Sequence, residues 1–185
     1  MNFKHISRIA GLSLVVAISS CTRHAGEPVS RAVLYNNETD VDTDGYVFFK
    51  LLHEKAKFET QLATYVQSAP ASSAAKELAA KVIETYEGMI PELESLAEAH
   101  FVVLPDPGMP GFSVPHHFST DSLGSFSSEA YIAHVQHEQG TILEQLRRAE
   151  RNTAKTLRTY AHEKLPAVEE VFALSGGKAD HGAHH

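Results

Sequence analysis

Apolar residues recur at helical spacing in four separate segments of the chain, and polar or turn-forming residues separate these segments. The segments cover residues 43–68, 73–100, 127–150 and 153–174. Their apolar faces consist of Phe48, Leu51, Leu62 and Val66 in the first, Leu78, Val82, Met89, Leu93 and Leu96 in the second, Tyr131, Val135, Ile142, Leu146 and Ala149 in the third, and Leu157, Ala161, Leu165, Val168 and Phe172 in the fourth. This periodicity predicts four amphipathic α-helices.

The predicted helices begin and end at residues that suit those places. Asp42 or Asp44 offers an N-cap for the first helix, a serine precedes the third, and Gly176 fits the end of the fourth. Pro91 lies inside the second helix, where a proline costs about 3 kcal/mol because it removes a hydrogen bond. Since the apolar phase continues past Pro91, we predict a kinked helix and not two helices.

Residues 101–126 contain four prolines and three glycines and have no helical period. The chain has no alternating β pattern, no internal repeat and no sustained heptad seam. We therefore expect an all-α, four-helix bundle over residues 43–175, with a long connector between its second and third helices.

The N-terminal residues have the order of a secretory signal: Lys4 and Arg8, then an uncharged apolar run, then small residues before Cys21. The run is shorter than the ~20 residues that cross a bilayer. The stretch ISSC, which ends at Cys21, resembles the bacterial lipobox, whose cysteine is acylated and becomes the first residue of the mature protein. We expect residues 1–20 to be a lipoprotein signal peptide and 21–42 a flexible tether. The alternative is a signal anchor with a buried Cys21 thiol.

Charge and cysteine content exclude several classes of protein. Without residues 1–20, fourteen Lys and Arg face twenty-three Asp and Glu, a formal charge of −9, so no basic surface for nucleic acid is expected. Cys21 is the only cysteine, so the chain has no internal disulfide to stabilise it. The final residues 176–185, GGKADHGAHH, are expected to form a disordered, His-rich tail.

Three stretches resemble the family called domain of unknown function 4142: DGYVFFKLLHEKAKFETQLA, ELAAKVIETYEGMIPELESLAEAHFVVLP, and AYIAHVQHEQGTILEQL with YAHEKLPAVEEV after it. The resemblance implies a ferritin-like bundle of the outer membrane and no particular reaction. Family members carry a Glu in the first helix, Asp-His in the second, and one His in each of the last two. The matching positions here are Glu59, Thr85, Tyr86, Gln139 (His137 if the register slips) and Val171, which implies that most of this set is lost.

The stretch HVQHE, with His134, His137 and Glu138, is the sharpest local candidate for metal binding. A helical wheel places Glu138 and Gln139 at the edges of the apolar face, His137 opposite it in solvent, and His134 on a flank. There we expect His134 to pair with Glu138 on the surface. Metal ligands in a bundle must project inward from facing helices, so no metal is expected in the core, and His134 and His137 are the candidate ligands.

A polar cluster is expected inside the bundle, because Lys55 and Glu59 share a helical face with apolar residues. Its members are Lys55, Glu59, Tyr86, Glu138 and Gln139. Two interpretations stay open: the remnant of a functional site, or an internal salt bridge near one end of the bundle, since buried ionic groups must be paired.

The remaining histidines cluster in the connector and the tail, where they could chelate a transition metal ion: His116, His117, His181, His184 and His185. No phosphate-binding loop and no catalytic nucleophile is evident. We predict a non-catalytic lipoprotein without a cofactor, held in the membrane by its lipid. Thr22, and not Asp, follows Cys21, which favours an outer-membrane anchor facing the periplasm in a Gram-negative cell. The alternatives are a ferritin-like metal or redox bundle, and metal buffering by the tail.

Overall fold

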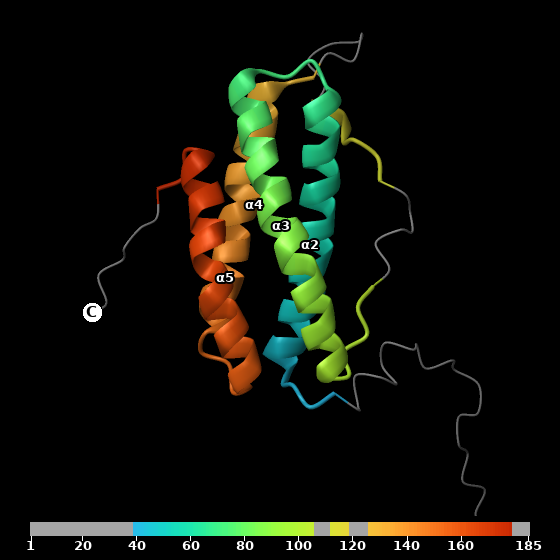
Figure 1. Ribbon diagram of the computed structural model, residues 1–185, viewed down its shortest axis with the longest axis vertical. Coiled ribbons are helices and arrows are strands. Elements are labelled where there is room, and N and C mark those ends of the chain that lie inside the picture. The colour runs from blue at the N-terminus through green and yellow to red at the C-terminus, as the bar shows by residue number, and fades with distance from the viewer. Residues whose placement is uncertain (1–38, 106–111, 119–125, 179–185) are drawn as a thin grey trace, which may run out of the picture.

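The computed structural model describes residues 39–105, 112–118 and 126–178. In these residues it forms four long α-helices, one short 3₁₀ turn and no β-strand (Figure 1). The elements are α2 (Thr43–Ser68), α3 (Ser73–Ala99), η1 (His116–Phe118), α4 (Ser128–Ala149) and α5 (Lys155–Leu174). The prediction of an all-α, four-helix protein is confirmed, and each helix lies within two residues of its predicted bounds.

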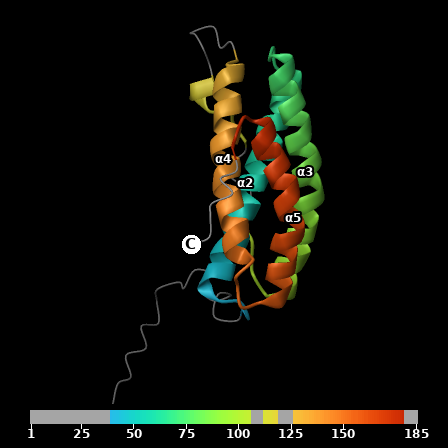
Figure 2. The ribbon, with the colours of Figure 1, turned by 90° about the vertical axis from the view of Figure 1, so that its left-hand side faces the viewer.

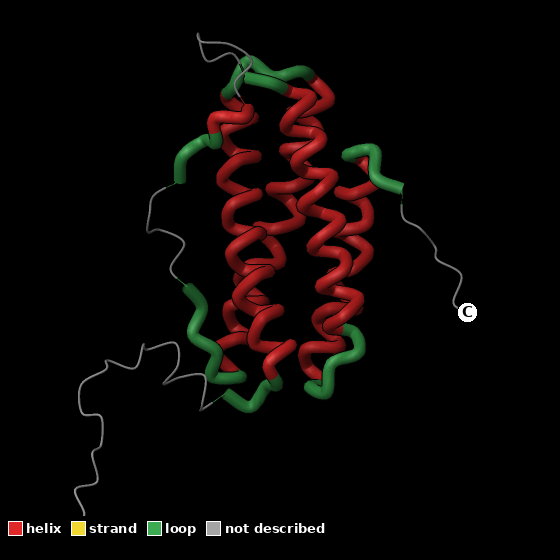
Figure 3. The backbone as a smooth tube through the Cα atoms, turned by 180° about the vertical axis from the view of Figure 1, so that it is seen from behind, coloured by secondary structure: helices red, strands yellow, loops and turns green. Residues whose placement is uncertain are grey.

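The helices run side by side in a bundle (Figures 1 and 2). Helix α2 packs mainly on α3 and α4 mainly on α5, while α2 against α4 and α3 against α5 close the bundle. Helices α3 and α4 run in the same direction, so α2 and α4 are antiparallel (Figure 1). The turns between helices lie at the two ends (Figure 3).

Side-chain caps explain where three of the helices begin. Asp42 Oδ1 accepts a hydrogen bond from the Gly45 amide at 2.7 Å, and Ser72 and Ser127 each accept one from the third residue after them, at 3.2 Å. These caps satisfy amide groups that have no partner within the helix. The predicted Asp cap of α2 is thus Asp42, while α5 begins at Lys155 behind Ala154, which has no side-chain cap.

Helix α3 continues through Pro91, as predicted, and α5 likewise continues through Pro166. A bend at Pro91 stays a prediction. Near this proline the Tyr160 hydroxyl of α5 donates to the Met89 carbonyl at 3.1 Å, which ties the two helices together at the irregular turn. The apolar phase therefore outweighs the local cost of proline when the helix is packed on two neighbours.

The core follows the predicted apolar faces with a small rotation in the outer positions. Leu51, Leu96, Leu165 and Phe172 are only half-buried, whereas Phe49, Leu52, Tyr160 and Val171, which the periodicity did not select, are buried. Each helix packs against two neighbouring helices. The buried surface of a helix is therefore wider than the single apolar face of a helical wheel, and its centre lies between the two neighbours.

Helix α3 ends in a Schellman motif, in which the Val102 amide donates to Ala97 O at 2.8 Å and the Phe101 amide to Glu98 O at 3.0 Å. The residue in the left-handed conformation is Phe101, with φ of 56°. Glycine usually occupies this place, because a side chain there costs roughly 1–2 kcal/mol.

Several expectations concern parts of the chain outside the described residues: the signal peptide at 1–20, Cys21, the tether up to residue 38, and His181, His184 and His185 of the tail. Among the helices that are described, none is both long and apolar enough to span a membrane.

We predict that Asp42→Ala destabilises the protein by about 1–2 kcal/mol near pH 7, because Asp42 both caps α2 and accepts hydrogen bonds from Asn152 and Thr153 in the α4–α5 turn. The Gly45 amide is the largest cause that lowers the pKa of Asp42 below its ordinary value of 3.8. A lowered folded-state pKa gives stability that is present above the unfolded pKa and is lost as the pH falls through the folded one.

Denaturant unfolding at about pH 7 and about pH 2.5 tests this, with a difference between wild type and variant that shrinks at the lower pH. Asp44→Ala is the matched control, because Asp44 lies in the same turn and its carboxylate forms an ion pair with the exposed side chain of Arg148. Equal losses for both substitutions would contradict the assignment.

Candidate functional site

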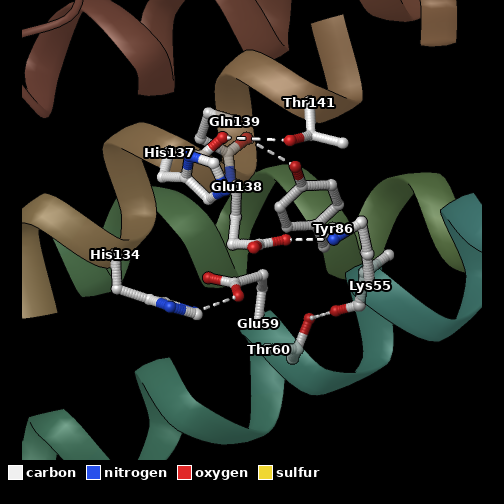
Figure 4. A network of polar contacts seen from close by, with 10 residues as sticks. Lys55, Glu59, Thr60, Tyr86, His134, His137, Glu138, Gln139 and Thr141 are labelled. Atoms are coloured by element: carbon white, nitrogen blue, oxygen red, sulfur yellow. Dashed lines mark hydrogen bonds and ion pairs between the residues drawn. The ribbon is translucent and has the colours of Figure 1, made fainter. Parts of the chain in front are cut away.

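A group of polar side chains lies within the apolar interior of the bundle (Figure 4). It consists of Lys55 and Glu59 from α2, Tyr86 from α3, and His134, Glu138 and Gln139 from α4. All six lie near the middle of their helices, so the expected position near one end of the bundle is wrong. We call this group the polar layer.

The spacing of the charged residues explains how they pair. Lys55 and Glu59 are four residues apart on α2, and His134 and Glu138 are four apart on α4, so each pair lies on one helical face. Because α2 and α4 are antiparallel, the pairs meet crosswise, with Glu59 opposite His134 and Lys55 opposite Glu138 (Figure 4).

The Glu59–His134 contact is the more buried of the two pairs. Glu59 Oε1 lies 2.7 Å from His134 Nε2, and the Glu59 side chain is 1% exposed against 18% for His134. The Lys55 ammonium donates to Glu138 Oε2, with side-chain exposures of 25% and 16%. Each carboxylate in the layer therefore has a basic partner from the facing helix.

Tyr86 and Gln139 complete the layer from the other side. The Tyr86 hydroxyl donates to Gln139 Oε1 at 2.5 Å, and both side chains are buried. Burial, with the nearby charge of Glu59, raises the pKa of the Tyr86 hydroxyl well above its ordinary value of 10.0. Burial and Glu59 likewise raise the pKa of Tyr131. Both phenols therefore stay neutral near pH 7, and the Tyr86 phenol acts as a hydrogen-bond donor and not as a base.

Three buried polar atoms near the layer have no hydrogen-bond partner among the described residues: Glu59 Oε2, Gln139 Nε2 and the Tyr131 hydroxyl. The set combines an acceptor, an amide donor and a hydroxyl that can do both.

Aromatic rings cover the side of the layer where His134 reaches toward solvent. Phe118 of η1 meets the His134 ring edge-on at 5.2 Å between centroids, and Phe58 of α2 lies 6.0 Å away. Phe118 also stacks on Phe126 at 6.1 Å. The exposed His117 lies 6.2 Å from His134, so it is the connector histidine that approaches the layer.

The structure places the other candidates as follows. His134 does not pair with Glu138 on the surface, as the wheel suggested; it turns inward to Glu59. Gln139, expected at an edge of the face, is fully buried. His137 and His116 are exposed. Of the positions matched to the family, Thr85 and Val171 are buried in the core.

A second polar contact escaped the sequence analysis. His53, which is buried, lies 2.9 Å from Glu94 of α3, and Lys57 lies 3.1 Å from the same carboxylate oxygen. The hydrogen bond from His53, with a further one from Lys57, lowers the pKa of Glu94. The sequence shows only that His53 and Lys57 share a helical face at i, i+4 spacing; that this face lies against Glu94 depends on how α2 and α3 pack.

Within residues 39–105, 112–118 and 126–178, no group of three or more His, Cys, Asp or Glu side chains lies close enough together to hold a metal ion. The Lys55 ammonium donates to one oxygen of the Glu138 carboxylate, so that oxygen already has a cationic partner. An open groove between α3 and α5 is lined by residues such as Leu96, Thr159 and Tyr160 and includes no member of the polar layer.

Comparison of the chain with protein families, with curated proteins and with solved structures finds no match. The resemblance to domain of unknown function 4142 therefore stays a prediction.

We predict that Lys55→Met destabilises the protein by about 1–3 kcal/mol, because it leaves the Glu138 carboxylate in the interior without a cation. The double substitution Lys55→Met with Glu138→Leu should restore most of this loss, since removing both charges leaves no ion to desolvate. Denaturant unfolding of the two single variants and the double variant gives the coupling energy.

The control is Arg148→Ala, which breaks a pair with Asp44 whose side chains are 60% and 58% exposed. Such a surface pair should cost less than about 0.5 kcal/mol. If the double variant is as unstable as Lys55→Met, the pair does not act as a unit.

Proposed function

We propose that this chain is a non-catalytic, ferritin-like helical-bundle lipoprotein of the type named domain of unknown function 4142. A lipid on Cys21 holds it at the outer membrane, with the bundle in the periplasm, where it serves an envelope or interaction role. The observation that supports a non-catalytic role is the pairing in the polar layer, where Lys55 pairs with Glu138 and His134 pairs with Glu59.

The residue types in the layer support a structural role. A ferritin-type two-metal centre takes a Glu from each of two helices and Glu-x-x-His from each of the other two, all directed inward. The matched positions here supply one inward Glu, Glu59, and otherwise a phenol, an amide, the hydroxyl of Thr85 and the apolar Val171, with no second carboxylate and no imidazole. The Tyr86 hydroxyl and the Gln139 amide oxygen are joined by a hydrogen bond, so neither oxygen is a free ligand.

The anchor rests on the order of residues before Cys21. A single acyl chain binds a bilayer only marginally, at about 0.8 kcal/mol per buried CH₂, whereas two or three chains hold a protein stably. A lipobox-type cysteine carries that number, so the bundle needs no spanning helix of its own.

We predict that mass spectrometry of the membrane-extracted protein finds an acylated N-terminal Cys21, and that Cys21→Ser moves the protein out of the membrane fraction. Cys21→Ser removes the sulfur that accepts the acyl group and leaves the bundle unchanged. Thr22→Ser serves as the control and should stay in the membrane fraction. An intact, unacylated Cys21 in the membrane would contradict the anchor.

The competing function, a ferritin-like metal or redox bundle, is tested by elemental analysis of the purified protein with residues 179–185 removed, which also separates any binding by the His-rich tail. We expect no stoichiometric iron or manganese, because Lys55 already neutralises the carboxylate facing it. Two ions per chain, lost in Glu59→Ala but not in His137→Ala, would establish the metal bundle instead.

A further inference from the structure

The chain from the proposed anchor enters the bundle beside the end of α3. The Thr39 hydroxyl donates to the His100 carbonyl at 2.7 Å, and Asp40 lies 2.5 Å from His100 Nδ1. Phe101 follows His100 in the chain. This end of the bundle also carries the start of α2 and the α4–α5 turn (Figure 1). We call it the entry end.

Phe101 is unusual in two independent ways. Its side chain is 63% exposed, the largest value among the exposed large apolar residues described. Its backbone holds a φ of 56°, where a glycine would close the same Schellman motif without strain. A lone exposed apolar residue is ordinary. A bulky one kept exposed at a conformational cost indicates a functional demand on that side chain.

The surroundings of Phe101 extend this surface. Val103, two residues further, is 47% exposed. His100 Nε2 lies 2.6 Å from the Thr156 hydroxyl, which places the first turn of α5 against the end of α3. Lys155, beside Thr156, is exposed, and so is Arg151 in the preceding turn. Apolar and cationic side chains therefore gather at one end of a chain whose overall charge is negative.

Three acidic residues at the entry end, all beside the start of α2, are engaged by partners within the chain, while Glu98 in the last turn of α3 is exposed. Asp40 contacts His100, Asp44 pairs with Arg148, and Asp42 is held by the α2 cap and by Asn152. The exposed Arg151 and Lys155 are therefore left to attract anions, and each Lys or Arg close to an anionic bilayer contributes about five-fold in affinity.

We propose that the entry end rests on an anionic phospholipid bilayer, with the Phe101 ring inserted at the boundary of headgroups and acyl chains and Arg151 and Lys155 against the headgroup phosphates. This deepens the proposed function, since it rests on the lipid at Cys21. Seventeen residues lie between Cys21 and Thr39, and the eighteen Cα–Cα steps that join these two residues span at most about 65 Å, more than the roughly 40 Å of α3. The link alone therefore permits either end to face the membrane. The entry end is selected by its surface.

Two features of the sequence allow a site-specific test of this proposal. It contains no tryptophan and one cysteine, Cys21. The mature chain, beginning at Cys21, is coupled through its thiol to a maleimide phospholipid in vesicles of phosphatidylglycerol and phosphatidylethanolamine with brominated acyl chains. Phe101→Trp then reports the entry end. Leu174→Trp is the control, because Leu174 is 46% exposed and lies about 28 Å from Lys155 along α5.

We expect bromine quenching and a blue shift of the indole emission for Phe101→Trp, and neither for Leu174→Trp. Val103→Trp, at a residue outside the strained position, should behave like Phe101→Trp and covers the case in which that variant folds poorly. Equal quenching at Leu174, or none at Phe101 and Val103, would overturn the proposal. Because the coupling supplies the lipid chemically, the result does not depend on whether the cell acylates Cys21.

Two further variants separate membrane contact from folding. In the uncoupled Cys21→Ser chain, Arg151→Gln with Lys155→Gln should weaken binding to the anionic vesicles about thirty-fold. Phe101→Gly should raise the denaturation midpoint while it weakens vesicle binding, because it relieves the left-handed strain and removes the inserted ring. Loss of both stability and binding in Phe101→Gly would show that Phe101 serves only the fold.

Discussion

An ionised carboxylate inside an apolar bundle needs a partner, and the burial of Glu59 imposes this requirement on the surrounding helices. Glu59 pairs with His134, and Glu138 pairs with Lys55. The neutral side chains of Tyr86 and Gln139 lie beside these pairs and share one hydrogen bond. The aromatic residues of η1 then cover His134 from outside. Four segments of the chain, α2, α3, η1 and α4, thus meet around the Glu59 carboxylate.

The features that depend on a single helix could be predicted from sequence. Periodicity gave the four helices, and Asp42 and Ser127 marked two starts, because caps act within one turn. The inward placement of Lys55 and Glu59 also followed from their face. The residue with which Glu59 pairs could not be predicted in this way. His134 sits on a flank of α4, and it becomes an interior residue only because Phe58 and Phe118 cover that flank, which no wheel of α4 alone contains.

The same limit explains why His53 was missed. Its contact with Glu94 depends on how α2 and α3 are rotated against each other, and the sequence of either helix shows only an ordinary histidine or glutamate. Pro91 and Pro166 show the opposite case, in which a local signal for a break is overruled by packing on two sides. Local sequence predicts where the helices lie, whereas a contact between side chains of two helices can be predicted only when the register of those helices is known.

The polar layer itself fixes that register. In the observed alignment Lys55 faces Glu138 and Glu59 faces His134. Sliding antiparallel α2 and α4 by one turn in one direction would oppose Glu59 to Glu138 and leave Lys55 against Ile142. A slide in the other direction would oppose Lys55 to His134 and Glu138 to Leu51. Each slide buries an uncompensated charge, a penalty of several kcal/mol, while the Leu, Val and Ala contacts around it would tolerate the shift. The layer thus adds little net stability but excludes competing alignments, and buried polar groups elsewhere are known to specify register in this way.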